Sequence, residues 1–149
     1  ANSRARLRMT TIYQIAQSNG ALVVGTGNKI EDFGVGFYTK YGDGGVDISP
    51  IGDLMKSEVR EMARELGVNE EILVALPTDG LWGDGRSDED QLGATYDELE
   101  RAMMVTPKEF TDYPSWTDRE KEVWRIYNRL NDVNRHKMDP IPVFIKNKK

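Results

Sequence analysis

The sequence predicts an α/β fold built around a parallel sheet, from two features near its amino terminus. An amphipathic helix is expected from Asn2 to Asn19, because apolar residues recur there at helical spacing. Residues 21–25 (ALVVG) then form a short unbroken apolar run, which is typical of a strand buried on both faces of a parallel sheet. A glycine-rich turn follows at once, and such sheets bind ligands at the carboxyl ends of their strands.

Helical patterns occupy much of the remaining chain. Apolar residues recur at helical spacing over residues 59–66, with Ser57 as the expected cap and Gly67 as the expected stop. A proline and three glycines predict a loop over residues 77–85. The middle of the chain is therefore expected to be one helix followed by a loop.

Three capping boxes predict further helix starts. Each places a glutamate three residues after a threonine, so that backbone N–H groups of the first turn find acceptors. The pairs are Thr95 with Glu98, Thr106 with Glu109, and Thr117 with Glu120. The last pair is expected to begin a long helix that ends near His136 and Lys137, because Pro140 prevents its continuation.

The composition argues against several classes of function. The chain has 149 residues, enough for one domain with a hydrophobic core, and a net charge of −5. That charge argues against general nucleic-acid binding, which requires a basic surface. The absence of cysteine excludes disulfides and thiol catalysis, and it fits a cytoplasmic location. With neither a long apolar run nor a signal-peptide pattern, no membrane association is expected.

The stretch Gly25–Lys56 holds most of the candidate chemistry. Its glycines free the backbone, its carboxylates suit a metal ion and its lysines can neutralise phosphate, as a nucleotide site requires. Thr26 follows the predicted strand, where its hydroxyl could contact a base or phosphate or bond its own backbone in a turn. Glu31 and Asp32 could supply a magnesium ligand, although acidic residues are also common where helices begin.

The second half of this stretch adds a loop and two charged residues. Residues 40–45 (KYGDGG) contain three glycines, which favours a tight turn or close approach to a ligand over a plain surface hairpin. Asp47 could accept hydrogen bonds from ligand hydroxyls or an amide, or cap a turn. Lys56 opposes the dipole of the next helix unless an anion is bound nearby, so a phosphate role is favoured over a plain surface position.

Other catalytic signatures are missing. The chain has no Ser-His-Asp order, zinc-ligand spacing, dinucleotide fingerprint or Walker A motif. His136 is the only histidine, and a histidine without histidine or cysteine partners is a poor metal site. From the residues alone, its default interpretation is a capping or surface position.

Six motifs occur in a characteristic order. They are RLRM (6–9), VVGTGNKIED (23–32), FYTKYGDGGVDISPIGDLMKSEVR (37–60), LPTDGLW (76–82), DEDQLGATYDELE (88–100) and NRHKM (134–138). Together they resemble the carboxyl-terminal part of NAD synthetase, and they span nearly the whole chain except residues 104–116. The resemblance implies the parallel-sheet, Rossmann-like fold of the adenine-nucleotide alpha-hydrolase-like ATP pyrophosphatases, incomplete here on its amino-terminal side.

The resemblance also implies an activity. The intact protein is expected to adenylate deamido-NAD with ATP and Mg²⁺, releasing pyrophosphate, and then to form NAD with ammonia, either free or supplied from glutamine. The implied site residues are Thr26, Lys56 and Thr78 for ATP, Glu31 for magnesium, and Arg6, Lys40, Asp47, His136 and Lys137 for deamido-NAD. No catalytic residue is implied. Members of the family are homodimers, so a homodimer is expected.

One family motif has no counterpart in the sequence. The S-G-G-x-D-S loop that grips pyrophosphate in the family is absent, and the chain begins at Ala1 rather than at methionine. Residues 1–149 are therefore expected to be the carboxyl-terminal part of a synthetase domain, which alone binds nucleotides weakly and does not catalyse. Two alternatives stay open: another carboxylate-adenylating ATP pyrophosphatase, such as a relative of GMP synthetase, or a non-catalytic fragment that only dimerises or binds nucleotide.

Overall fold

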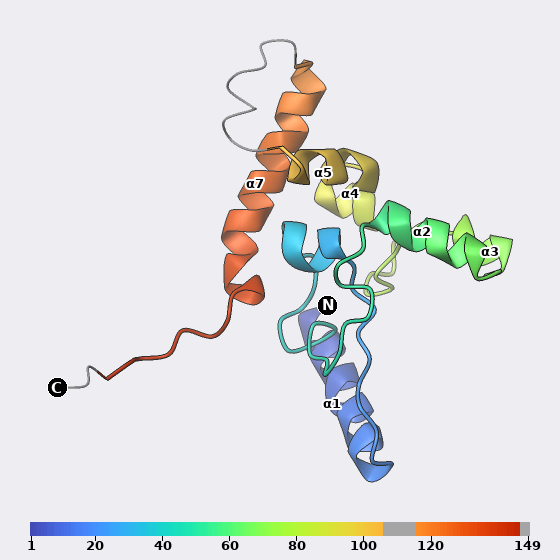
Figure 1. Ribbon diagram of the computed structural model, residues 1–149, viewed down its shortest axis with the longest axis vertical. Coiled ribbons are helices and arrows are strands. Elements are labelled where there is room, and N and C mark those ends of the chain that lie inside the picture. The colour runs from blue at the N-terminus through green and yellow to red at the C-terminus, as the bar shows by residue number, and fades with distance from the viewer. Residues whose placement is uncertain (106–115, 147–149) are drawn as a thin grey trace.

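The structure is a computed structural model that describes residues 1–105 and 116–146 (Figure 1). Its elements in chain order are α1 (Asn2–Ser18), the π-helical turn η1 (Ile30–Val35), α2 (Lys56–Glu65), α3 (Glu70–Leu73), α4 (Asp88–Leu92), α5 (Tyr96–Met103) and α7 (Asp118–Met138). In this part of the chain, no helix has the length and apolar character needed to cross a membrane.

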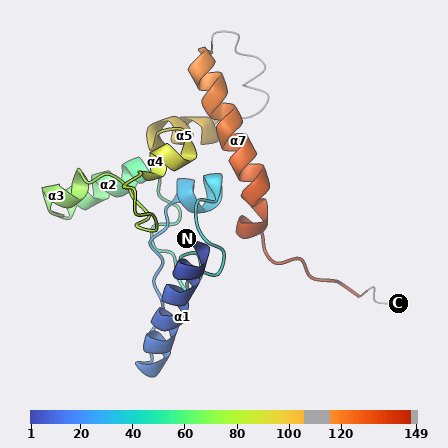
Figure 2. The same ribbon diagram turned by 180° about the vertical axis from the view of Figure 1, so that it is seen from behind.

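The hydrophobic core lies where η1, α5 and α7 meet, as both ribbon views show (Figures 1 and 2). It includes Ile30 and Val35 from η1, Tyr96 and Leu99 from α5, and Val123 from α7, all almost completely buried. Burial of such side chains contributes about 1.5–3 kcal/mol each relative to exposure. The core therefore fixes η1, the element that carries Glu31.

Polar side chains of α7 complete the attachment of η1. Asn131 and Asn134 donate from Nδ2 to the backbone carbonyls of Gly34 and Val35, at 2.7 and 2.8 Å. These carbonyls lie at the end of η1, where helical carbonyls lack partners within the helix. The amide side chains supply the missing donors and hold α7 against η1.

Helix α1 extends away from this core (Figures 1 and 2). Its observed bounds agree with the expected range to within one residue, but Ala5 is its one buried residue. It is tied to the rest of the chain by polar contacts. The Thr39 hydroxyl donates to Asn2 Oδ1 at 3.0 Å, and the Tyr13 hydroxyl donates to Asp47 Oδ1 at 3.1 Å.

The strand expected over residues 21–25 is reduced to a single bridge. Val24 pairs with Ile48 in parallel orientation, and the described residues contain no strand of more than this one bridge. Leu22 and Val24 are 65% and 55% exposed, so the expectation of burial on both faces is wrong in this structure. The physical reason is that a strand needs paired neighbours on its edges, and the described chain supplies only residues 46–48. The expected parallel sheet is therefore not confirmed.

The start of α2 corrects one detail of the sequence interpretation. Ser57 is not its cap; Met55 occupies that position, and its backbone N–H donates to Glu58 Oε2 at 2.7 Å. The Ser57 hydroxyl instead donates to Glu100 of α5 at 2.7 Å. The stop at Gly67 is confirmed, because α2 ends just before it and Gly67 has φ +71°.

Two of the three capping boxes are confirmed. Thr95 with Glu98 begins α5, and Thr117 with Glu120 begins α7, which ends at Met138 as expected. The third pair, Thr106 with Glu109, lies outside the described residues. Helices α3 and α4 were not predicted, because four and five residues are too few to show a periodic pattern.

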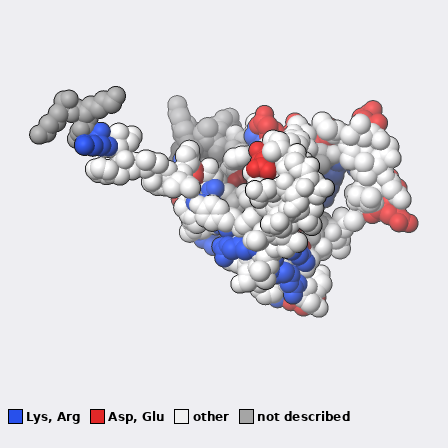
Figure 3. All heavy atoms as spheres, turned by 90° about the horizontal axis from the view of Figure 1, so that it is seen from below, with Lys and Arg blue, Asp and Glu red and all other residues white. Residues whose placement is uncertain are grey.

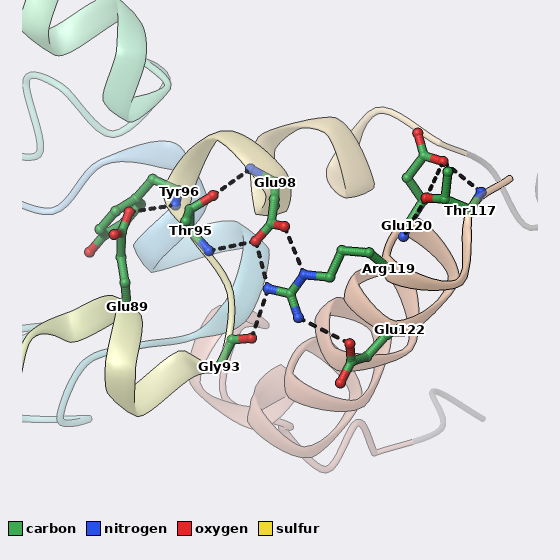
Figure 4. A network of polar contacts seen from close by, with 9 residues as sticks. All are labelled: Glu89, Gly93, Thr95, Tyr96, Glu98, Thr117, Arg119, Glu120 and Glu122. Carbon is green, nitrogen blue, oxygen red and sulfur yellow. Dashed lines mark hydrogen bonds and ion pairs between the residues drawn. The ribbon is translucent and has the colours of Figure 1, made fainter.

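A guanidinium on α7 clamps α5 to α7 (Figure 4). Arg119 donates from Nε and Nη2 to the two carboxylate oxygens of Glu98, both at 2.8 Å, and also to the Gly93 carbonyl at 3.2 Å. Its remaining nitrogen, Nη1, donates to Glu122 at 3.1 Å. Two parallel charge-assisted bonds are stronger and more directional than one, so this contact fixes how the two helices cross.

This clamp predicts a loss of stability in acid. Hydrogen bonding to Arg119 lowers the pKa of the Glu98 carboxyl from 4.5 to about 2. A carboxyl whose pKa is lower in the folded state stabilises the fold above its unfolded pKa, and this contribution disappears as the pH falls through the folded pKa. The thermal unfolding midpoint is therefore expected to fall between about pH 4.5 and pH 2.

The measurement is the unfolding midpoint as a function of pH, followed by circular dichroism. Glu98→Gln should unfold at lower temperature near neutral pH and show a smaller fall in acid. Glu122→Gln removes the more exposed carboxylate on the same guanidinium and should keep the fall. An identical acid profile for Glu98→Gln and the unsubstituted protein would contradict the assignment.

Candidate functional site

A cavity of about 280 Å³ brings together four residues that the sequence singled out. Its lining includes Thr26, Glu31, Lys56 and Thr78. They come from the turn after the Val24 bridge, from η1, from the first residue of α2 and from the loop before α4. Residues that the resemblance assigns to ATP and to magnesium therefore face one space.

Glu31 is the best-anchored charge in this cavity. It lies in the first turn of η1, as the sequence indicated, and its Oε1 accepts from Lys56 Nζ at 3.2 Å and from the Tyr96 hydroxyl at 2.6 Å. Lys56 Nζ also lies 4.9 Å from the centre of the Tyr96 ring, within the range of a cation–π contact. Both donors engage Oε1. Among the described residues, Glu31 Oε2 makes only a long contact of 3.5 Å, with the backbone N–H of Asn28.

The backbone at the start of η1 is fixed by Asn28. Its Oδ1 accepts from the N–H groups of Ile30 and Glu31, both at 3.1 Å, and the side chain is buried. Asparagine is among the preferred residues for this capping role. The sequence interpretation missed Asn28, although an asparagine three residues before an acidic residue was an available signal.

Asp88 is a buried carboxylate of the cavity that sequence reasoning missed. It is 7% exposed; its Oδ2 lies 3.4 Å from the Tyr96 hydroxyl, and its Oδ1 has no hydrogen-bond partner within the described chain. Burial raises the pKa of the Asp88 carboxyl, and the charges of Glu31 and Asp79 raise it further, while Lys56 opposes them. The cavity therefore concentrates negative charge, which one lysine, Lys56, offsets among the lining residues that the structure describes.

The carboxylate of Asp32 lies in a different place from that of the preceding residue, Glu31. A Cβ at Gly27 would lie 2.2 Å from Asp32 Oδ2, so the carboxylate packs directly against the glycine backbone. Burial, together with the charges of Glu31 and Asp43, raises the pKa of the Asp32 carboxyl to about 6. The two adjacent acidic residues therefore have different surroundings: Glu31 lines the cavity, and Asp32 fills the space beside Gly27.

Three of the residues assigned by resemblance to deamido-NAD form a connected group. Arg6 Nε donates to the Lys40 carbonyl at 3.3 Å, and Lys40 Nζ donates to the His136 carbonyl. His136 lies in the last turn of α7 and is exposed, which agrees with its default interpretation as a surface residue. The group joins α1, the glycine-rich loop and the end of α7.

Lys137 and Asp47 are engaged with the protein itself. Lys137 Nζ donates to the carbonyls of Gly36 and Tyr38 at 2.7 and 2.8 Å, and burial lowers the pKa of its amine. Asp47 accepts from the Tyr13 hydroxyl through Oδ1 and from the Val23 N–H through Oδ2, the latter at 2.8 Å. The structure does not bring Asp47 into contact with the Arg6–Lys40–His136 group.

Two further hollows adjoin the cavity. They have volumes of about 250 and 330 Å³, and both share Asp43 and Asp79 with it. Lys137 lines the first hollow and Thr26 lines the second. Asp43 and Asp79 therefore lie where the three spaces meet, between the residues assigned to ATP and those near the end of α7.

Helix α1 carries exposed positive charge despite the acidic composition of the chain. Seen from below, several Lys and Arg atoms lie along the lower middle of the face, while Asp and Glu atoms lie above them and at the right and lower edges (Figure 3). Helix α1, at the bottom of Figure 1, contributes the exposed Arg4, Arg6 and Arg8. These three guanidinium groups are the kind of positive charge that attracts an anionic ligand.

The family follows from comparison of the chain with known proteins. A family model described as NAD synthase matches residues 1–140, and the chain therefore belongs to the NAD synthase family. It is 54% identical to an NH(3)-dependent NAD(+) synthetase of Methanococcoides burtonii, over 69% of this chain and 38% of that protein. It is 41% identical to the protein of the same name from Archaeoglobus fulgidus, over 96% of this chain and 54% of that protein. The chain thus spans about half, or less, of these relatives' length.

Solved structures support the same family fold. A structure of NMN synthetase from Francisella tularensis matches with a TM-score of 0.77 and 35% identity, covering 95% of this chain and 54% of that one. A structure of NH3-dependent NAD synthetase from Campylobacter jejuni, in complex with nitrate ion, matches with a TM-score of 0.67 and 24% identity. It covers 97% of this chain and 54% of that one, and at this identity it supports the fold alone.

Proposed function

We propose that the protein containing this chain is an ammonia-dependent NAD synthase, a ligase that forms a C–N bond. The carboxylate of deamido-NAD attacks the α-phosphorus of ATP and pyrophosphate leaves. Ammonia then attacks the acyl carbon of the adenylate, and AMP leaves to give NAD. The observation that carries the proposal is the single cavity lined by Thr26, Glu31, Lys56 and Thr78, in a chain whose relatives are named NH(3)-dependent NAD(+) synthetase.

Each residue has a role suited to its position in the cavity or outside it. Lys56 would neutralise phosphate charge as pyrophosphate departs, and Thr26 and Thr78 would donate hydrogen bonds to ATP. Arg6, Lys40, His136 and Lys137 would contact deamido-NAD, and Asp47 would reach it only if its bonds to Tyr13 and Val23 were exchanged. Fixed charges and donors of this kind lower a barrier by positioning substrates and stabilising developing charge.

The cavity also suits Mg²⁺. The described residues contain no group of three acidic or histidine side chains placed to hold a metal, but Mg²⁺ prefers one or two carboxylates together with substrate phosphates. Glu31 Oε2 has only one long contact among the described residues, and the buried Asp88 Oδ1 has no partner there, as expected where a cation binds. Glu31 would hold Mg²⁺, and the ion would neutralise negative charge on the phosphates of ATP.

The test is an assay of the protein expressed from its complete coding sequence. With ATP, Mg²⁺, deamido-NAD and ammonium, chromatography should show NAD, AMP and pyrophosphate in equal amounts. Ammonium should support the reaction without glutamine. Formation of ADP and phosphate, or absence of NAD from a folded protein, would contradict the proposal.

Other acceptors in the same assay separate the alternatives. The structural neighbour named NMN synthetase makes nicotinic acid mononucleotide the second candidate substrate, since it carries the same carboxylate on a smaller nucleotide. Xanthosine monophosphate tests a relative of GMP synthetase. Calorimetric binding of deamido-NAD without turnover would favour a fragment that only binds nucleotide. The homodimer, the cytoplasmic location and the assignment of residues 1–149 to the carboxyl-terminal part of a synthetase domain stay predictions.

A further inference from the structure

The buried side chain of Tyr96 contacts three charged residues of the cavity, Glu31, Lys56 and Asp88. The side chain is completely buried at the start of α5, and its hydroxyl donates to Glu31 Oε1 at 2.6 Å, with Asp88 Oδ2 at 3.4 Å. Its ring lies beneath the amine of Lys56, at 4.9 Å from the ring centre. One rigid side chain thus contacts both members of the Glu31–Lys56 pair.

Glu100 makes a second connection one helical turn later. Its Oε1 accepts from the Ser57 N–H at 3.0 Å, and its Oε2 accepts from the Ser57 hydroxyl at 2.7 Å. Ser57 directly follows Lys56 at the start of α2. Residues four apart lie on the same face of a helix, so Tyr96 and Glu100 project from one side of α5.

Helix α5 is itself held firmly. Its start is fixed by the Thr95–Glu98 capping box, and the two oxygens of Glu98 are bound by Arg119 of α7 (Figure 4). The backbone N–H of Tyr96 also donates to Glu89 of α4 at 2.9 Å. The face of α5 that carries Tyr96 and Glu100 therefore has a defined position relative to the core.

We propose that Tyr96 and Glu100 are positioning residues that set the orientation of Glu31 and the place of Lys56, and so determine how well the cavity binds a divalent cation with a nucleotide. The proposal deepens the proposed function and rests on it. Tyr96 holds Glu31 Oε1 and keeps Oε2 available to the cation. Without the hydroxyl, the carboxylate can rotate and offer both oxygens to Lys56, which competes with the metal.

The decisive variant is Tyr96→Phe, which keeps the ring beneath Lys56 and removes only the hydroxyl. Hydrogen-bond partners of metal ligands typically contribute 10–100-fold to metal affinity, so we expect Mn²⁺ to bind about 10-fold more weakly. The measurement is electron paramagnetic resonance of Mn²⁺ with a non-hydrolysable ATP analogue, on the protein expressed from its complete coding sequence. Tyr127→Phe is the matched control: it removes the hydroxyl of a second, partly buried tyrosine that packs against the core, and it should bind Mn²⁺ normally.

Glu100 gives an independent test. Glu100→Ala should raise the KM for ATP about 10-fold, by the same reasoning for outer residues of a site. Glu100→Gln keeps an oxygen that can accept from Ser57, and it should restore most of the lost ATP affinity. A purely structural role would instead lower the unfolding midpoint without changing KM in the folded protein.

The outcomes separate this proposal from the proposed function. Normal Mn²⁺ affinity in folded Tyr96→Phe, or an equal loss in Tyr127→Phe, would overturn the positioning role even if the protein makes NAD. Weaker Mn²⁺ binding in Tyr96→Phe alone would support that role even if no NAD were formed, and the failure would then belong to the proposed function.

Discussion

Gly36→Ala is expected to lower the free energy of unfolding by roughly 2–5 kcal/mol, from the cost of a left-handed residue and of overpacking. Gly36 ends η1 with φ +64°, a conformation that alanine rarely adopts. The added Cβ would lie 2.4 Å from Asn134 Cβ, close to the α7 backbone, so a side-chain rotation cannot relieve the overlap. Helix α7 would have to move away from η1, weakening the bond from Asn134 to the Val35 carbonyl.

The control is Gly67→Ala. Gly67 has a similar φ of +71°, but a Cβ there would meet no atom within 4 Å in the described structure. This substitution should therefore cost only the conformational part, about 1–2 kcal/mol. Urea unfolding midpoints of the two variants measure the difference. Equal losses would show that η1 and α7 are not packed as closely as the structure has them.

If the proposed function holds, Lys56→Met in the protein expressed from its complete coding sequence is expected to reduce ATP-dependent NAD formation by about 100-fold or more, the scale typical of losing one preorganised charge or donor. The substitution removes the one lysine among the described residues that line the cavity, and it leaves Glu31 without its ion-pair partner. An unpaired, partly buried carboxylate beside phosphate groups repels them, so ATP affinity should fall together with the rate. Initial rates at varied ATP and direct ATP titration measure the two effects.

Lys29→Met is the matched control, because it also removes a lysine that forms an ion pair with a carboxylate, here Asp53. Lys29 Nζ lies 2.9 Å from Asp53, but the Asp53 side chain is 95% exposed, and such surface pairs contribute little. Its rate should stay within about twofold of the unsubstituted protein's, as a difference of a few tenths of a kcal/mol implies. A comparable loss in both variants would point to overall charge rather than to the position of Lys56.

The helical framework was largely predictable from the sequence. Helix α1, the capped starts of α5 and α7, and the stop at Gly67 all follow from interactions between residues a few positions apart. The buried strand over residues 21–25 was wrong, since pairing and burial depend on neighbours that local sequence does not specify. Ser57 was wrong as a cap for a similar reason: Glu100, 43 positions away, engages its hydroxyl.

Some residues of the candidate site were likewise predictable from the sequence, and others were not. The sequence singled out Thr26, Glu31 and Lys56, because their residue types and order are typical of a nucleotide site. It gave no signal for Tyr96 or Asp88, since a buried tyrosine and an acidic residue near a helix start look ordinary in any sequence. Their significance arises only from distances to Glu31 across the fold.

By itself, the sequence determined helices α1, α2, α5 and α7, most of their ends and the residues able to carry nucleotide chemistry, because these depend on short-range hydrogen bonds, periodicity and side-chain type. The tertiary structure alone decided that Glu31, Lys56 and Thr78 line one cavity, that Asp32 turns away from it, and that Asp47 is bound to α1. The physical reason is that burial and charge proximity are properties of packing. They bring together groups that the chain keeps far apart.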